Sequence, residues 1–291
     1  MSNYKLFSDS SCDLPASYVQ QYNIGIIPYS VSLGDEIYYK EILELKTEDF
    51  YKKIVSENVF PKTSLPSIQD YIDAFTPALE AGKDIICICL SAKFSGSFQS
   101  ALNAKNILLE NYERNIEIID SRQATGGQGL LLYEMAQMQS AGYDFEKVVS
   151  KTEQLRDTAK INFTVESLEH LQKGGRIGKA SALAGNILNI KPIITMWHGE
   201  LRPVGKVRGF QKAVKTMIDI TEKEIGSEAE KYQLCVLSAE NINKALELKQ
   251  MLQETTSYNI LHLPFQVGVT IGSHAGPTAL GICYIKKYEF L

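Results

Sequence analysis

Apolar and polar residues alternate along the first half of the chain in a way that predicts strands and helices in turn. Short apolar runs predict strands at 5–7, 24–31, 85–90 and 116–120, of which the strand at 85–90 is expected to be fully buried. Between these runs apolar residues recur at helical spacing, and the predicted helices span 68–79, 96–110 and 126–141. This alternation is typical of an α/β domain with a mainly parallel sheet, in which ligands bind beyond the carboxyl ends of the strands.

The second half differs from the first and begins with a long predicted helix at 144–160. Further strands are predicted at 162–165, 193–194, 201–207, 233–237, 259–263 and 281–288. Further helices are predicted at 210–225 and 241–253. We therefore expect an α/β protein with two α/β domains, residues 1–158 and 159–291.

The segment 168–195 departs from the pattern of a plain core helix. It begins with Leu168 and Leu171 on one helical face and reaches Gly174-Gly175, where a helix end can turn left-handed. A run of mostly small residues, 180–185, follows and lets backbones approach closely or leaves space for another molecule. The pattern indicates a turn beside a slot, and hence a binding site.

Composition and charge narrow the classes of function. A net charge of −4 lacks the basic surplus that is typical of nucleic-acid-binding proteins. Residues 1–11 show no signal-peptide pattern, and no apolar run reaches the ~18 residues of a membrane span. We therefore expect a cytoplasmic protein without a transmembrane segment or a nucleic-acid partner. The five cysteines and four histidines lack metal-ligand spacing, so we expect buried free thiols and no metal site.

Polar loops supply the candidate chemistry. Three of them follow or interrupt apolar segments: Lys62–Ser67 with Thr63, Leu90–Ala101 with Ser95, and Gly272–Gly281 with His274. Hydroxyls before a helix are usually caps, and Ser67 is expected to cap the helix 68–79. Taken together, however, hydroxyls and an imidazole are suited to hold a carboxylate or phosphate oxygen by hydrogen bonds.

Other candidate motifs are weaker. The stretch KGGRIGKA is not a phosphate-binding loop, because Lys173 stands where the first glycine belongs and Ala180 where a Ser or Thr should follow. Asp9 and Asp13 follow the first strand, where carboxylates cap a helix more often than they bind a metal, and their role stays open. Cys12 is a nucleophile only if a histidine lies beside it.

Six motifs in register make the chain resemble the DegV family. They are SDSSCDLP at 8–15, KTSLPS at 62–67, SGSFQSA at 95–101, IDSRQATGGQGLL at 119–131, LEHLQKGGRIGKASALAGNILNIKPII at 168–194 and HAGPTALG at 274–281. The resemblance implies two α/β domains with a long-chain fatty acid held between them. It extends to the fatty-acid-binding subunits of bacterial fatty acid kinase. Such subunits have no catalytic activity or cofactor of their own and present the carboxylate to a separate ATP-dependent kinase subunit.

The resemblance also assigns roles to individual residues. Thr63, Ser95 and His274 match the family positions that hydrogen-bond the fatty acid carboxyl, and the backbone of Gly96 is expected to assist them. Arg202 falls in the region that, by resemblance, lies near the face that meets the kinase. No residue is expected to be catalytic.

Two alternatives remain open on the residues alone. One is a hydrolase or transferase with Ser95 as nucleophile and His274 as base, although the chain shows no acidic partner and no nucleophile elbow. The other is a binding protein for a phosphorylated small molecule. That function calls for basic residues at the loops, and Lys62, Lys93 and Arg176 are the candidates. The fatty acid carrier is preferred, mostly on the resemblance.

Overall fold

We analysed a computed structural model that describes residues 3–34, 36–57, 59–183, 189–255 and 258–291. Its N-terminal part contains a four-stranded parallel sheet in the order β2-β1-β6-β7. The strands are β1 (Tyr4–Asp9), β2 (Gly25–Ile27), β6 (Asp84–Cys89) and β7 (Ile116–Asp120). The helices around it are α1 (Ala16–Gln21), α3 (Ile68–Glu80), α4 (Ser97–Leu108), α5 (Thr125–Ser140) and α6 (Phe145–Arg156). Every residue of β6 is buried, as its apolar run predicts.

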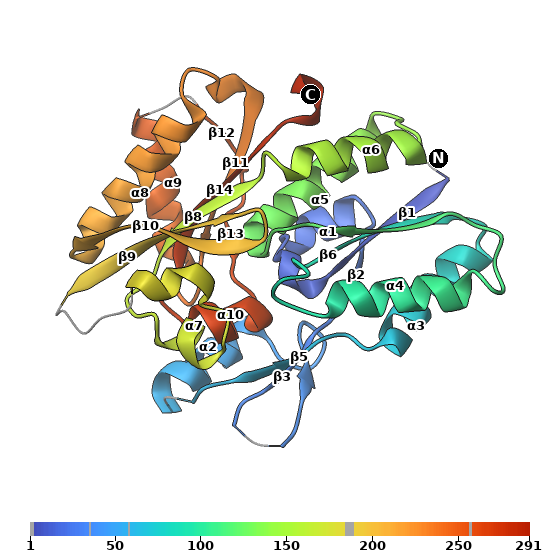
Figure 1. The fold of residues 1–291 in the computed structure, drawn as a ribbon, viewed down its shortest axis with the longest axis horizontal. Coiled ribbons are helices and arrows are strands. Elements are labelled where there is room, and N and C mark those ends of the chain that lie inside the picture. The colour runs from blue at the N-terminus through green and yellow to red at the C-terminus, as the bar shows by residue number, and fades with distance from the viewer. Residues whose placement is uncertain (1–2, 35, 58, 184–188, 256–257) are drawn as a thin grey trace.

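A second, mixed sheet lies beside the first (Figure 1). Its order is β10-β9-β8-β14-β11-β12, and β13 also pairs with β11. The strands are β8 (Lys160–Thr164), β9 (Ile190–Trp197), β10 (Glu200–Arg208), β11 (Tyr232–Ser238), β12 (Asn259–Ile260), β13 (Phe265–Gln266) and β14 (Leu280–Lys286). Helices α8 (Phe210–Ile225) and α9 (Ile242–Thr255) pack on this sheet, and α7 is Glu169–Lys173.

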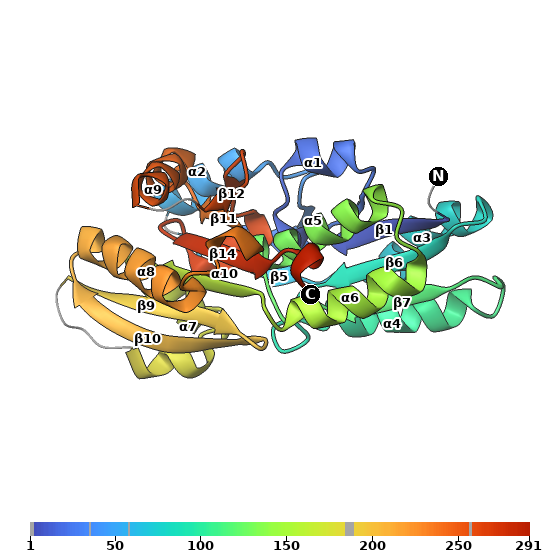
Figure 2. The same ribbon diagram turned by 90° about the horizontal axis from the view of Figure 1, so that it is seen from above.

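Helix α5 joins the two sheets, and Figures 1 and 2 both show it at their junction. It contacts β1 and β6 of the first sheet and β8, β11 and β14 of the second. Its glycine-rich start permits this close approach. A Cβ at Gly126 would lie 2.8 Å from the Cys283 sulfur, and one at Gly129 would lie 2.5 Å from the Cys12 carbonyl oxygen.

A small antiparallel sheet in the order β4-β3-β5 comes from the N-terminal part of the chain. Its strands are β3 (Ser30–Ser32), β4 (Tyr39–Lys40) and β5 (Lys62–Ser64). Helix α2 (Thr47–Glu57) lies between β4 and β5 in the sequence. Helix α10 (Val269–Ala275), from the end of the chain, contacts α2, β3 and β5. Figure 1 shows this group below the two sheets.

The predicted α/β fold with a parallel N-terminal sheet is confirmed, but several elements differ. The segment 24–31 is not one strand, because Pro28 separates β2 from β3 and these join different sheets. The helix predicted at 144–160 ends at Arg156, because Lys160 already begins β8. The strand predicted at 259–263 stops at Ile260.

The small-residue run begins as a short 3₁₀ turn, Gly178–Leu183, and its remainder, Ala184 and Gly185, lies outside the described residues. The last strand of the first sheet ends at Asp120, and the first strand of the second sheet begins at Lys160. The boundary at 158 remains a prediction.

All five cysteines are free and buried. No helix among the described residues is long and apolar enough to cross a membrane.

Candidate ligand-binding site

A cavity lies between the two large sheets and the small one. The space between its lining residues amounts to about 970 Å³ when the open solvent at its mouth is included. Both parts of the chain contribute apolar lining, including Leu90, Phe94, Ile161, Met196, Leu201 and Leu237. A cavity with a mostly apolar lining and few polar groups is typical of a small-molecule site.

The four predicted head-group residues all line this cavity: Thr63, Ser95, Gly96 and His274. Thr63 lies in strand β5, and His274 lies in the last turn of helix α10, so neither sits in the loop expected from the sequence. Thr63 Oγ1 and His274 Nε2 are 2.9 Å apart and share a hydrogen bond, although 211 residues separate them. The structure therefore brings these residues together, while their role as ligand contacts remains a prediction.

Ser95 is oriented by two donors. The Tyr29 hydroxyl donates to Ser95 Oγ at 2.8 Å, and the Ser97 backbone N–H donates to the same oxygen at 3.1 Å. A hydroxyl that already accepts two hydrogen bonds keeps its own proton for a further acceptor. Gly96 is the N-cap of α4, a helix end that carries partial positive charge. This side of the cavity is thus suited to an anionic oxygen.

The imidazole of His274 is neutral at pH 7. Burial, with smaller effects from Arg176 and His170, lowers the pKa of His274 to about 4. Its second nitrogen, Nδ1, is buried and has no hydrogen-bond partner among the described residues. It lies against Gly174, where a Cβ would approach Nδ1 to 2.2 Å. The double glycine therefore ends α7 and also leaves room for the imidazole, whereas the sequence indicated only the turn.

A buried carboxylate supports the Ser95 turn from behind. Asp9 accepts hydrogen bonds from Ser97 Oγ at 2.7 Å, the Leu90 N–H at 2.9 Å and Gln128 Nε2 at 2.9 Å. Burial raises the pKa of Asp9, and these donors oppose the rise. Asp9 therefore holds the β6–α4 turn.

Burial also raises the pKa of Cys12 to about 12, which removes the thiolate that a nucleophile requires.

Sequence reasoning underestimated Arg176, which it named only for a phosphorylated ligand. Arg176 lines the cavity and donates from Nη1 to the Gly174 carbonyl at 2.7 Å and from Nε to the Phe94 carbonyl at 3.3 Å. Its position two residues after the glycine pair was the available signal. Lys93 instead pairs with Glu200 at 2.9 Å, outside the cavity lining.

Arg202 lies apart from the head-group residues. It is on β10, where its guanidinium packs over the Trp197 ring at 5.1 Å and lies 3.6 Å from the Glu200 carboxylate. Lys179 and Lys93 also hydrogen-bond Glu200 and lower its pKa to about 2. Arg202 thus belongs to a charged surface cluster, and the neighbouring Leu201 lines the cavity. Its predicted contact with a kinase remains a prediction.

The fold places a mostly apolar cavity with a few polar groups between two sheets, an arrangement suited to an amphipathic small molecule. The family model described as "Uncharacterised protein, DegV family" matches residues 3–287. The chain therefore belongs to the DegV family.

The similarity to relatives covers nearly the whole chain. A DegV domain-containing protein of Clostridium acetobutylicum is 33% identical over 288 residues, which cover 99% of this chain and 100% of the relative. A stearic acid-binding protein from Eubacterium ventriosum is 34% identical with a TM-score of 0.95, covering 99% of this chain and 100% of that one. A fatty-acid-binding DegV protein from Bacillus subtilis is 28% identical with a TM-score of 0.86, covering 99% and 100%.

Proposed function

We propose that the protein binds one long-chain fatty acid in this cavity, with the carboxylate at Thr63, Ser95 and His274. The observation that carries the proposal is the joining of these three polar side chains at one apolar cavity. Relatives at 34% and 28% identity bind stearic acid and fatty acids, which supports the same ligand class here.

The chemistry divides between the two ends of the ligand. Each buried methylene contributes about 0.8 kcal/mol, so the acyl chain supplies most of the affinity. The free proton of Ser95 and the hydroxyl of Thr63 donate to the carboxylate. Neutral His274, with its proton on Nε2, donates to Thr63 Oγ1 and so leaves the Thr63 proton free for the carboxylate, while the nearby guanidinium of Arg176 balances the negative charge.

The finer role that we propose is that of a carrier without catalytic activity or cofactor of its own. It presents the carboxylate to a separate ATP-dependent fatty acid kinase subunit in the cytoplasm, for acyl phosphate formation in phospholipid metabolism. The family resemblance supports this role. The partly exposed side chain of Arg202 follows the cavity-lining Leu201 in β10 and is available for contact with a partner protein.

The alternative enzyme needs a hydrogen bond between Ser95 and His274. In the described residues His274 Nε2 bonds Thr63, and Ser95 Oγ accepts from Tyr29 and Ser97. The low pKa of His274 also makes it a weak base. This arrangement favours binding over nucleophilic catalysis. For the phosphorylated ligand, Arg176 is the one proposed cation that lines the cavity, which gives little charge for a dianion.

The test is mass spectrometry of organic extracts from the purified, undigested protein. We expect a near-stoichiometric long-chain fatty acid, and less of it in Ser95→Ala and His274→Ala variants that melt at the wild-type temperature. Wild-type retention and phosphorylation in both variants contradict the head-group assignment. Wild-type protein that neither yields a fatty acid nor binds added stearate contradicts the carrier function itself.

A further inference from the structure

Helix α10 carries His274 but has little to stabilise it by itself. It is seven residues long, and isolated helices this short are unstable in water. Its N-cap is Gly268, which has no side chain to bond the free N–H groups of the first turn. The position of His274 must therefore be fixed by contacts from elsewhere in the chain.

Glu41 supplies these contacts from the N-terminal part. Its Oε1 accepts a hydrogen bond from the Thr270 N–H at 3.1 Å, and its Oε2 accepts one from Thr270 Oγ1 at 2.7 Å. Glu41 is 2% exposed and Thr270 is also 2% exposed, so both hydrogen bonds are shielded from water. Thr270 lies four residues before His274, one helical turn along the same face. Holding Thr270 therefore holds His274.

The same carboxylate connects to the other side of the head-group site. Ser10 Oγ donates to Glu41 Oε2 at 2.7 Å, and the Tyr29 N–H donates to Ser10 Oγ at 3.0 Å. The hydroxyl of that tyrosine donates to Ser95 Oγ at 2.8 Å. Glu41 thus lies at the centre of a series of hydrogen-bonded residues that ends at Ser95 in one direction and at Thr270, on the helix of His274, in the other.

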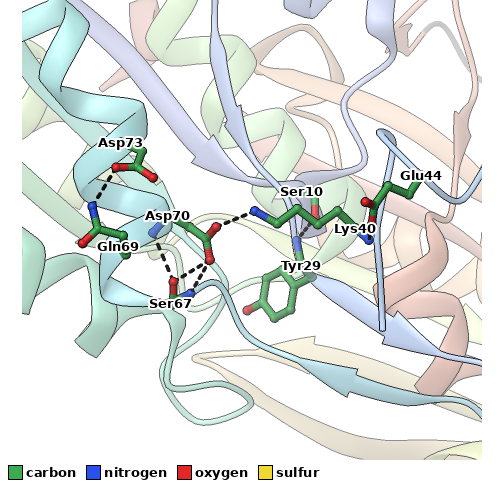
Figure 3. Close-up of polar contacts among 8 residues, drawn as sticks. All are labelled: Ser10, Tyr29, Lys40, Glu44, Ser67, Gln69, Asp70 and Asp73. Carbon is green, nitrogen blue, oxygen red and sulfur yellow. Dashed lines mark hydrogen bonds and ion pairs between the residues drawn. The ribbon is translucent and has the colours of Figure 1, made fainter. Parts of the chain in front are cut away.

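The backbone on either side of Glu41 is held in place. Lys40 forms an ion pair with Asp70 at 2.6 Å, and Asp70 is in turn bonded to Ser67 in the capping box of α3 (Figure 3). The Lys40 N–H also donates to Glu44 at 2.6 Å. On the other side, Ile42 has a φ of +70° although it is β-branched and 61% exposed. Such strain persists only where the surroundings determine the backbone, and here it accompanies the inward turn of Glu41.

We propose that Glu41 is a positioning residue of the fatty acid head-group site. It caps α10 so that His274 meets Thr63, and it orients Tyr29 and thereby Ser95. The proposal rests on the proposed function for its ligand. The position of His274 can also be followed in the ligand-free protein, through the pKa of its imidazole.

The variants separate positioning from general stability. Glu41→Gln places an NH₂ group opposite the Ser10 and Thr270 hydroxyls, which must then turn from donors into acceptors and give up their present hydrogen bonds to the carboxylate. Thr270→Val removes the hydroxyl from the helix side. Thr270→Ser restores that hydroxyl. The matched control is Glu134→Gln on α5, because Glu134 is also 2% exposed and accepts a backbone N–H, that of Tyr288, away from the cavity lining.

Two measurements are made on lipid-free protein: stearate affinity by calorimetry and the pKa of His274 by NMR. We expect Glu41→Gln and Thr270→Val to weaken stearate binding about tenfold, the effect of one lost head-group hydrogen bond. We also expect the pKa of His274 to rise from about 4 toward its usual 6.5 as the site opens to water. Thr270→Ser and Glu134→Gln should leave both quantities at their wild-type values.

The outcomes are distinguishable. A folded Glu41→Gln variant with wild-type affinity and wild-type His274 titration overturns the inference. If Glu41→Gln does not fold, wild-type values of both quantities in Thr270→Val overturn it. If the wild-type protein fails to bind stearate, the proposed function fails, and an unchanged His274 titration in the variants then decides against the positioning role as well. Shifts in Glu134→Gln equal to those in Glu41→Gln also overturn it.

Discussion

Replacing Gly174 by alanine is the sharpest test of the head-group geometry. Gly174 has φ −75° and ψ −8°, dihedral angles that alanine adopts without strain, although the new Cβ would lie 3.0 Å from the His170 carbonyl oxygen, which must give by a few tenths of an ångström. The new Cβ, however, would lie 2.2 Å from His274 Nδ1, whereas ordinary contacts begin at 3.4 Å. The imidazole or the end of α7 must therefore move by about 1.2 Å.

A movement of this size breaks the contact that defines the site. The distance from His274 Nε2 to Thr63 Oγ1 is 2.9 Å, and adding the displacement brings it to roughly 4 Å, beyond hydrogen-bond range. Overpacking costs about 1–3 kcal/mol, and the lost hydrogen bond costs about 1 kcal/mol. We expect about 2 kcal/mol of this to appear in binding, which is roughly a thirtyfold weaker affinity for stearate.

Gly175→Ala is the matched control. Gly175 has φ +69°, and a Cβ there would meet no atom within 4 Å. Alanine at this position costs about 1–2 kcal/mol of backbone strain without touching His274. Calorimetry with stearate and thermal unfolding should therefore separate the two variants, with Gly174→Ala losing affinity and Gly175→Ala losing stability. Wild-type affinity in Gly174→Ala, or equal losses of affinity in both variants, would refute the reasoning.

Three further predictions follow from charge and burial. Because the pKa of His274 is lowered to about 4, the ligand-free protein should lose stability as pH falls from about 6.5 to about 4, by up to roughly 3 kcal/mol, and denaturant titrations of His274→Gln should lack this loss. Burial raises the pKa of Glu134 to about 7, so its contribution to stability is present below about pH 4.5 and lost as pH rises to 7; Glu134→Gln should show a flatter pH profile over that window. Arg202→Ala should retain fatty acid in mass spectra and weaken phosphorylation by a partner kinase, and an empty cavity in this variant would assign Arg202 to the ligand site.

The sequence by itself determined the α/β class and most of the long elements. The reason is that hydrophobic periodicity is a local property: β6 is an unbroken apolar run, and α8 and α9 alternate faces over several turns. It also identified the residue types of the site, because hydroxyls and an imidazole stand out in loops of small residues. Several short elements escaped it, among them β4, β5, β13 and α10, since a single turn of helix or a strand of two or three residues contains too few positions to show a period.

Tertiary structure alone decided how these pieces meet. That β5 faces α10, so that Thr63 reaches His274, depends on packing between segments that no local pattern relates. The same holds for Arg176 at the cavity, and for Glu41, whose burial contradicts the usual exposure of glutamate and is possible only because Thr270 and Ser10 supply its hydrogen bonds. From the sequence alone, a charged side chain in a loop is expected to be exposed to solvent. Glu41 is buried only because residues far from it in the sequence donate hydrogen bonds to it.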